Sequence, residues 1–140
     1  NNCISIDGVL PTKDNLNCKT QPCYLNSNLV NKLQLVNQAM GNTGWQVTEP
    51  YPPRATHKDS CHAPGTNAGT CADIALPGDN SFQKMDMFLD AIKAQGLRVG
   101  YETNSTSTYA TWMKEPILSA HRASLQYNAS ATGQHAHVEL

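Results

Sequence analysis

Hydrophobic residues recur at three- and four-residue spacing in two stretches of the chain, which is typical of helices with one buried face. The first stretch predicts a helix that Ser27 caps and that runs to about Met40. The second predicts a helix over residues 82–95, with Ser81 as its cap and Gly96 as its stop. The apolar faces consist of Leu29, Leu33, Val36 and Met40 in the first helix and Phe82, Met85, Leu89 and Ile92 in the second. We expect both faces to lie in the hydrophobic core.

Four short segments either alternate apolar and polar residues or are mostly apolar, and each predicts a β-strand. They cover residues 45–48, 71–76, 97–101 and 135–140. The last segment alternates most clearly and should be a terminal strand. Helices and strands in this order predict an α+β fold with a mainly antiparallel sheet packed against the helices.

The remaining segments predict loops rather than further elements. Residues 1–26 contain three cysteines and two prolines without any period, and we expect an irregular segment that a disulfide ties. Residues 49–70 are rich in proline and glycine and predict a long loop. Residues 103–111 are rich in serine and threonine and predict a surface loop, and Pro116 prevents a long helix after it. No repeat is visible, so residues 1–140 are expected to form a single domain.

The composition limits the kinds of function that this chain can have. The chain has 140 residues, of which 15% are charged, and its formal net charge is -1. This balance excludes nucleic acid binding by bulk electrostatics. No apolar run approaches the roughly 20 residues that span a bilayer. A polar, weakly charged surface is common in secreted proteins, so we expect an extracytoplasmic location, whether secreted, periplasmic or cell-wall associated. The start at Asn1 suggests a mature or trimmed chain.

The cysteines support the same location, because small domains with many cysteines are usually exported. The five are Cys3, Cys18, Cys23, Cys61 and Cys71. Cys61 and Cys71 bracket one loop and are expected to pair, while the other three provide one pair and one remaining thiol that the sequence does not assign. Two alternatives are five reduced cysteines, or Cys61 and Cys71 as metal ligands beside His62. Adjacent residues rarely aim at one ion, which disfavours the second alternative.

Histidines and a carboxylate occur in a pattern that suits zinc. His62 lies on the long loop, and Asp73 lies in the predicted strand to which that loop leads. His135 and His137 are two residues apart in a predicted strand, so both point to one face. Two imidazoles and a carboxylate are typical zinc ligands, and three protein ligands leave one position for water, as in catalytic zinc sites. His57 and His121 stand alone, and Asp86 and Asp90 are expected on a solvated helix face.

These motifs resemble the zinc D,D-carboxypeptidase and D-alanyl-D-alanine dipeptidase family, whose fold is shared with lysostaphin-type endopeptidases and hedgehog signalling domains. The family pattern is Ser-x-His, then Gly-x-Ala-x-Asp, then a later His-x-His on a strand. The matching residues are Ser60-x-His62, Gly69-Thr70-Cys71-Ala72-Asp73 and His135-x-His137. The resemblance covers residues 45–76 and 133–140 and implies a hedgehog/D,D-peptidase-like zinc fold.

The resemblance also implies roles for individual residues. His62, Asp73 and His137 would bind the zinc ion, and His135 would bind or polarise the substrate carbonyl. Arg54 stands where the family places an arginine that meets a substrate carboxylate. Ser60 and Gln134 would contact the substrate.

Gln134 is the most important departure from the family. Many members carry a glutamate base three residues before the last zinc histidine, and a glutamine cannot accept a proton from water. Residues that could replace the base are His135, Glu139 and Glu102. The loop from His62 to Asp73 is also longer than usual, and Cys71 stands at the alanine position of the pattern.

Two functions of different classes follow from these observations. The first is a zinc metallopeptidase that hydrolyses peptidoglycan peptide bonds, as a D,D-carboxypeptidase or an endopeptidase, with zinc-activated water. The second is a non-catalytic module that keeps the zinc and binds a cell-wall peptide or a protein partner. The complete ligand set favours the first function, and Gln134 favours the second.

Overall fold

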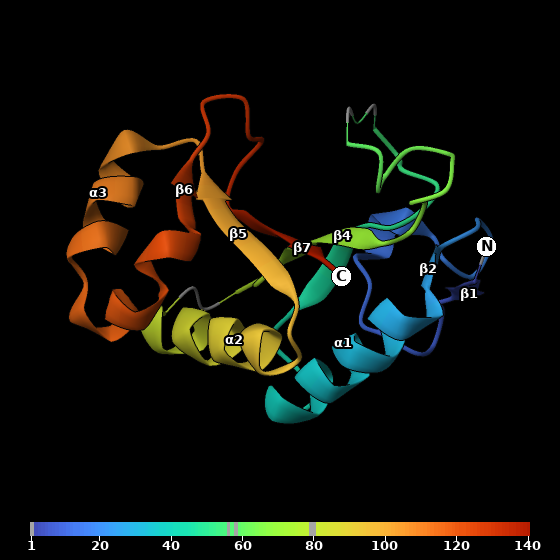
Figure 1. Ribbon diagram of the computed structural model, residues 1–140, viewed down its shortest axis with the longest axis horizontal. Helices are drawn as coiled ribbons and strands as arrows, with labels where there is room; N and C mark the ends of the chain where they lie inside the picture. The colour runs from blue at the N-terminus through green and yellow to red at the C-terminus, as the bar shows by residue number, and fades with distance from the viewer. Residues whose placement is uncertain (1, 56, 58, 79–80) are drawn as a thin grey trace.

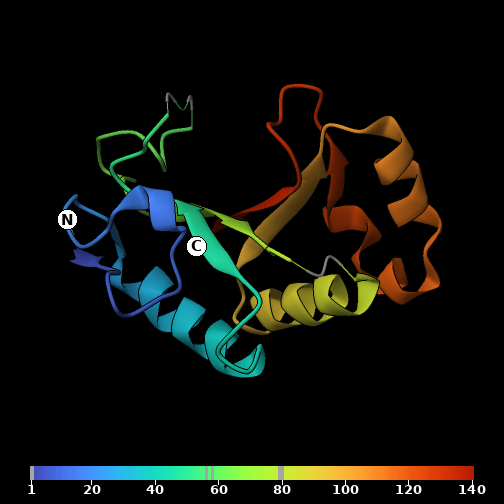
Figure 2. The ribbon, with the colours of Figure 1, turned by 180° about the vertical axis from the view of Figure 1, so that it is seen from behind.

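The computed structural model describes residues 2–55, 57, 59–78 and 81–140. Its centre is a five-stranded sheet in the order β3-β4-β7-β5-β6, in which all neighbours are antiparallel except β5 and β6. The strands are β3 (Gln46–Glu49), β4 (Cys71–Ala75), β5 (Arg98–Thr103), β6 (Leu125–Tyr127) and β7 (His135–Glu139). Helices α1 (Ser27–Ala39) and α2 (Phe82–Ala94) contact each other and lie on one side of the sheet (Figures 1 and 2). The predicted α+β class with a mainly antiparallel sheet is therefore confirmed.

Smaller elements flank the sheet at both ends. The N-terminal part forms a two-stranded antiparallel sheet from β1 (Cys3–Ser5) and β2 (Tyr24–Asn26), with the 3-10 helix η1 (Asp14–Leu16) between them. At the other end, α3 (Thr106–Lys114) and the 3-10 helix η2 (Pro116–Ser124) pack against β6 (Figure 1). None of the described helices is long and apolar enough to cross a membrane.

Both predicted core helices are present, and one cap differs from the prediction. The hydroxyl of Ser81 accepts a hydrogen bond from the backbone N–H of Lys84, as expected for the cap of α2. Gly96 follows that helix in the left-handed region, with φ of 69°. The cap of α1 is Asn26 rather than Ser27, since the Asn26 side chain accepts from the backbone N–H groups of residues 28 and 29.

The predicted surface loop at residues 103–111 is wrong, because most of this segment belongs to α3. Ser105 caps the helix by accepting from the backbone N–H of Thr108. Trp112 is buried, and its ring centroid lies 5.3 Å from that of Tyr101 in an edge-to-face contact. Packing of this aromatic residue outweighs the weak helix propensity of serine and threonine. The expected break at Pro116 is confirmed, since α3 ends just before it.

The last strand is central in the sheet rather than at its edge. β7 lies between β4 and β5 and pairs with both. Ala136 and Val138 face the core and are fully buried, whereas His135, His137 and Glu139 are only partly buried. This alternation places the side chains of three polar residues on the face of the sheet away from α1 and α2.

Two disulfides tie the loops of the chain. Cys61 pairs with Cys71, as expected, and Cys18 pairs with Cys23. The remaining thiol, Cys3, lies with its sulfur 3.4 Å from the carbonyl oxygen of Ala68. The expectation that residues 1–26 are disulfide-tied is confirmed, although they also contain strands. Two disulfides fit an extracytoplasmic location.

Candidate metal centre

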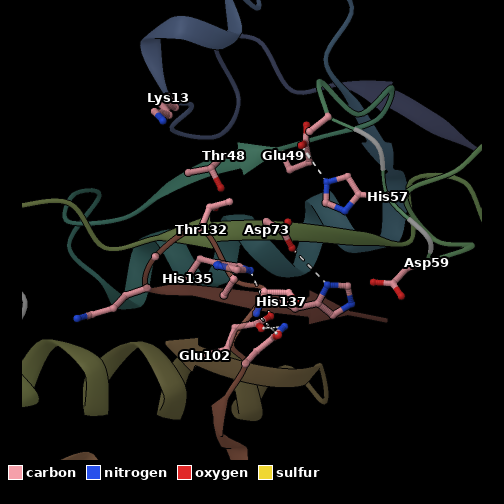
Figure 3. Close-up of a pocket in the computed structure, with 16 residues that line it drawn as sticks. Lys13, Thr48, Glu49, His57, Asp59, Asp73, Glu102, Thr132, His135 and His137 are labelled. Carbon is pink, nitrogen blue, oxygen red and sulfur yellow. Dashed lines mark hydrogen bonds and ion pairs between the residues drawn. The ribbon is translucent and has the colours of Figure 1, made fainter. Parts of the chain in front are cut away.

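A polar cavity of about 650 Å³ opens on the face of the sheet away from α1 and α2. It is bounded by the segment after β3 and by the loop that leads into β7, which both rise on this side in Figure 1. The residues that Figure 3 labels in its lining are Lys13, Thr48, Glu49, His57, Asp59, Asp73, Glu102, Thr132, His135 and His137. A register shift in β3 between residues 47 and 49 lets both Thr48 and Glu49 reach the cavity.

Asp73 and His137 form the centre of the site. They are direct cross-strand neighbours on β4 and β7, and Oδ1 of Asp73 lies 3.3 Å from Nδ1 of His137. Burial alone would raise the pKa of Asp73, but the hydrogen bond with His137 and the nearby ring of His62 outweigh it. The pKa of this carboxyl therefore lies well below its usual range. The carboxylate of Asp73 is ionised at neutral pH.

His62 comes to the same place from the loop between β3 and β4. Its Nε2 atom lies 3.4 Å from Oδ1 of Asp73. The disulfide of Cys61 with Cys71 ties this part of the loop to the start of β4, and the backbone N–H of Gly69 donates to the carbonyl oxygen of Cys61. The fold thus brings three predicted metal ligands together.

The two ring nitrogens of His62 are the clearest sign of a ligand. The side chain is only 1% exposed, and apart from the 3.4 Å ion-pair contact of Nε2 with Asp73, neither nitrogen has a hydrogen-bond partner among the described residues. A buried polar group without a partner costs about 1–3 kcal/mol, so proteins rarely keep one without a purpose. A metal ion beside Asp73 would accept the lone pair of one nitrogen.

The residues present fit a metal ion. His62 and His137 offer ring nitrogens within 4.8 Å of one another, in a group that also includes the sulfur atoms of Cys61 and Cys71. Those sulfur atoms form a disulfide, and the thiolate is the form of cysteine that binds metals. The donors that remain are the two histidines and Asp73, a set that suits zinc and related divalent metals.

Glu139 fixes the orientation of His137. Its Oε1 atom lies 2.9 Å from Nε2 of His137, so the two ring nitrogens of this histidine face two different carboxylates. Arg98 donates to the other oxygen of Glu139. The hydrogen bond with Asp73 raises the pKa of His137 to about 9, burial opposes this rise, and Glu139 adds to it. Metal-binding histidines commonly have such a carboxylate on their second nitrogen.

His135 and Gln134 also line the cavity, as expected for substrate contacts. His135 lies opposite Glu102 on the neighbouring strand β5, and its Nε2 atom lies 3.3 Å from Oε1 of Glu102. The side-chain amide of Asn128 donates to Oε2 of Glu102 at 2.6 Å. A second acid–histidine pair therefore stands next to the Asp73–His137 pair.

His57 does not stand alone, contrary to the sequence-based expectation. Its ring centroid lies 4.2 Å from that of His62, and Nε2 lies 2.9 Å from Oε2 of Glu49. One nitrogen of His57 also falls within 4.8 Å of donor atoms of His62 and Asp73. The sequence carries no signal for this contact beyond the location of both histidines on one loop.

Two predicted substrate contacts do not reach the cavity. Arg54 donates through its guanidinium to the carbonyl oxygens of Leu16, Pro22 and Pro52, so it braces the N-terminal segment. Ser60 is exposed on the loop and is not part of the lining. Lys13 provides the lysine or arginine side chain among the described lining residues, and sequence analysis did not identify it.

His121 belongs to a separate cluster. It is buried, and its Nε2 atom lies 2.9 Å from Asp86 and 3.0 Å from Asp90. Its Nδ1 atom lies 2.9 Å from the ammonium group of Lys93. The two aspartates therefore pair with a buried histidine and are not simply a solvated helix face. Both nitrogens of His121 are satisfied, in contrast to those of His62.

The comparisons with known proteins add no relative. No family model, no curated protein and no solved structure matches the chain. The assignment of a function therefore rests on the residues of the site.

Proposed function

We propose that the protein is a zinc metallopeptidase that hydrolyses peptide bonds of peptidoglycan, with the hedgehog/D,D-peptidase-like zinc fold that its motifs resemble. The observation that carries the proposal is the buried imidazole of His62, whose two nitrogens form no hydrogen bond among the described residues although an ionised carboxylate lies 3.4 Å from Nε2. Three further features support it: the cross-strand pair of Asp73 and His137, the carboxylate of Glu139 behind it, and the open polar cavity in front.

Each residue of the site would have a separate role in hydrolysis. His62, Asp73 and His137 would hold the zinc ion, and Glu139 keeps the ring of His137 in place. Bound zinc would polarise a carbonyl group and lower the pKa of water. His135 lies two positions before His137 on the same face, where its ring can meet the oxygen of the substrate carbonyl.

The cavity fits a peptide that ends in a free carboxylate. Its volume of about 650 Å³ is within the usual range of small-ligand sites, roughly 300–1,000 Å³. Lys13 is held beside β3 by the hydrogen bond from its backbone N–H to the carbonyl oxygen of Val47. Its ammonium group has no hydrogen bond or ion pair within the part of the chain that the structure describes. Lys13 can therefore take the role that the resemblance implied for Arg54.

One observation favours a non-catalytic binding module instead. Gln134 lines the cavity at the position where many members of the family carry a glutamate base. A module of this kind would keep the zinc ion and bind a cell-wall peptide or a protein partner without hydrolysis.

The test combines metal content with product release. The purified protein is analysed for zinc per chain and incubated with a peptidoglycan pentapeptide and with a crosslinked dimer, beside a His137→Ala control. We expect one zinc per chain and release of D-alanine, or cleavage of the crosslink, that the control lacks. One zinc without hydrolysis of either substrate would favour the binding module. Absence of zinc from protein that was never exposed to a chelator would overturn both functions.

A further inference from the structure

We propose that Glu102 is the general base of this hydrolysis and fills the role that Gln134 cannot. This inference rests on the proposed function and assigns one more residue of the same site. The sequence does not show where Glu102 lies relative to the site, because Glu102 is on β5 and the His-x-His motif is on β7, and no local pattern predicts that these strands pair.

The sheet places Glu102 beside the metal ligands without making it one of them. On β5, Gly100 pairs with His137 and Glu102 pairs with His135. Glu102 is therefore the diagonal neighbour of His137, and diagonal neighbours in an antiparallel pair are about 7–8 Å apart at their Cα atoms, within reach of long side chains. Gly100 has no side chain of its own, and the side-chain amide of Gln126 packs over it, beside Glu102. Glu102 lines both the main cavity and a second one of about 380 Å³ that His137 and Glu139 also line.

The carboxylate of Glu102 is held in position by an amide and an imidazole. Asn128 donates to Oε2 at 2.6 Å, and His135 lies 3.3 Å from Oε1. Its side chain is only 12% exposed. Figure 3 shows Glu102 below His135 and His137, with its carboxylate among the side chains that face the cavity. A general base needs such a fixed position within hydrogen-bond reach of the attacking water.

The other carboxylates around the cavity have different tasks. Glu139 binds Arg98 with one oxygen and His137 with the other, so both of its oxygens are already engaged by charged or ring partners. Glu49 accepts from the backbone N–H of Arg54 and pairs with His57. Asp73 is a proposed ligand. Asp59 is exposed, and no described side chain forms a hydrogen bond or ion pair with its carboxylate.

The proposed step conserves atoms and charge. Glu102 accepts one proton from a water molecule while the oxygen of that water bonds to the peptide carbonyl carbon. The proton then passes from Glu102 to the peptide nitrogen as the carbon–nitrogen bond breaks. One water is consumed, an acid and an amine are formed, and the carboxylate of Glu102 is regenerated. His135 and Asn128 act as positioning residues for Glu102.

The experiment compares Glu102→Gln and Glu102→Asp with the unchanged protein. We measure zinc per chain, the calorimetric affinity for a non-hydrolysable peptide analogue, and kcat and KM for the cleaved peptide. For Glu102→Gln we expect unchanged zinc, affinity within about threefold, and a kcat that falls at least about 100-fold, as loss of a general base does. Glu102→Asp should retain more activity than Glu102→Gln, because it keeps a carboxylate. The matched control is Glu115→Gln, an identical change outside the cavity, which should leave every quantity unchanged.

Two results would overturn the inference while leaving the proposed function intact. One is zinc-dependent hydrolysis by Glu102→Gln within about threefold of the unchanged protein. The other is a large loss of kcat in Asp59→Asn with little loss in Glu102→Gln. If the unchanged protein hydrolyses no peptide although it holds zinc, the proposed function itself fails and this inference fails with it.

Discussion

Asp73 and His137 are 64 residues apart in the chain, yet Oδ1 of Asp73 lies 3.3 Å from Nδ1 of His137. The contact follows from the pairing of β4 with β7, which sets these two residues directly opposite each other. His62 joins them from a loop that a disulfide ties to the start of β4. A rigid sheet thus carries two of the proposed ligands and a tied loop carries the third, an arrangement that favours a preorganised metal site.

Replacement of His62 should separate metal binding from stability. In His62→Leu we expect loss of zinc binding, while the free energy of unfolding of the metal-free protein changes by less than about 1 kcal/mol. The reason is that leucine removes two buried nitrogens that form no hydrogen bond among the described residues, which raises stability, but it also removes the ring that faces the carboxylate of Asp73, which lowers it. The measurements are zinc titration and urea unfolding in the presence of chelator.

The matched control for that change is His121→Leu. His121 is equally buried, but its nitrogens pair with Asp86, Asp90 and Lys93. This variant should keep the zinc and lose about 1–3 kcal/mol, because it leaves charged partners unpaired. Equal effects of the two leucine variants on metal-free stability would contradict the assignment of His62 as a ligand.

The stability of the metal-free protein should depend on pH through His137. The pKa of this histidine is raised from 6.5 to about 9, mainly by the hydrogen bond with Asp73. The protonated form is therefore favoured in the folded state. The contribution of protonated His137 to the free energy of unfolding is fully present below about pH 6.5 and is lost as the pH rises through 9. Because the pair is partly exposed, we expect a loss on the order of 1–2 kcal/mol.

Urea unfolding at pH 6 and at pH 9.5, with chelator present, measures this loss. Asp73→Asn removes the main cause of the raised pKa and should flatten the dependence between these two pH values. A slope that persists unchanged in Asp73→Asn would show that another group is responsible. Zinc binding near neutral pH should release a proton, because a histidine ligand must be neutral.

The disulfide between Cys61 and Cys71 should matter for both stability and metal affinity. It closes a loop with a sequence separation of 10 and carries His62 next to its first cysteine. In Cys61→Ala/Cys71→Ala we expect a loss of about 2–3 kcal/mol from greater chain entropy of the unfolded state. Zinc affinity should fall too, since ordering the loop must then be driven by metal binding.

Calorimetric titration with zinc and thermal unfolding test this expectation. The comparison variant is Cys18→Ala/Cys23→Ala, which removes the other disulfide, far from the ligands in the chain. It should lower stability but leave the zinc affinity nearly unchanged. A similar fall in affinity in both double variants would mean that general destabilisation, and not the tie on His62, controls metal binding.

Lys13 should decide the preference for a free carboxylate. In Lys13→Met we expect KM for a peptide with a free C-terminus to rise about tenfold or more, the equivalent of about 1.4 kcal/mol of binding. The same peptide with an amidated C-terminus should show little change, because it has no charge for the ammonium group to meet. Steady-state kinetics on the two peptides give both values.

Lys114→Met is the control, because it removes the same charge from an exposed residue in α3, away from the cavity. An equal rise of KM for the free and the amidated peptide in Lys13→Met would exclude a carboxylate contact. It would indicate that the side chain shapes the cavity without binding the chain end.

Sequence pattern alone was sufficient for the main elements of the fold. The helices at residues 27–39 and 82–94 and the strands β3, β4, β5 and β7 follow from periodicity, caps and glycine stops, which act over a few neighbouring residues. The expected pairing of Cys61 with Cys71 was also correct, since a short loop keeps the two cysteines close.

The elements that sequence analysis missed depend on distant contacts. α3 has a weak helical pattern and is held by the contact of Trp112 with Tyr101. β6 has only three residues and forms by pairing with β5. The cap of α1 at Asn26 also differs from the prediction by one residue, because neighbouring polar residues can serve equally as caps.

For the site, the sequence determined the types of donor and their local direction, because the two-residue period of a strand places His135 and His137 on one face. Only the tertiary structure decided which residues join them. The pairing of β5 with β7 places Glu102 opposite His135, and the folding of the loop places the ring of His57 against that of His62. The N-terminal segment binds the guanidinium of Arg54, and its Lys13 lines the cavity. The physical reason is that local periodicity fixes where a side chain points, whereas the pairing of strands and the packing of loops depend on contacts between residues far apart in the chain.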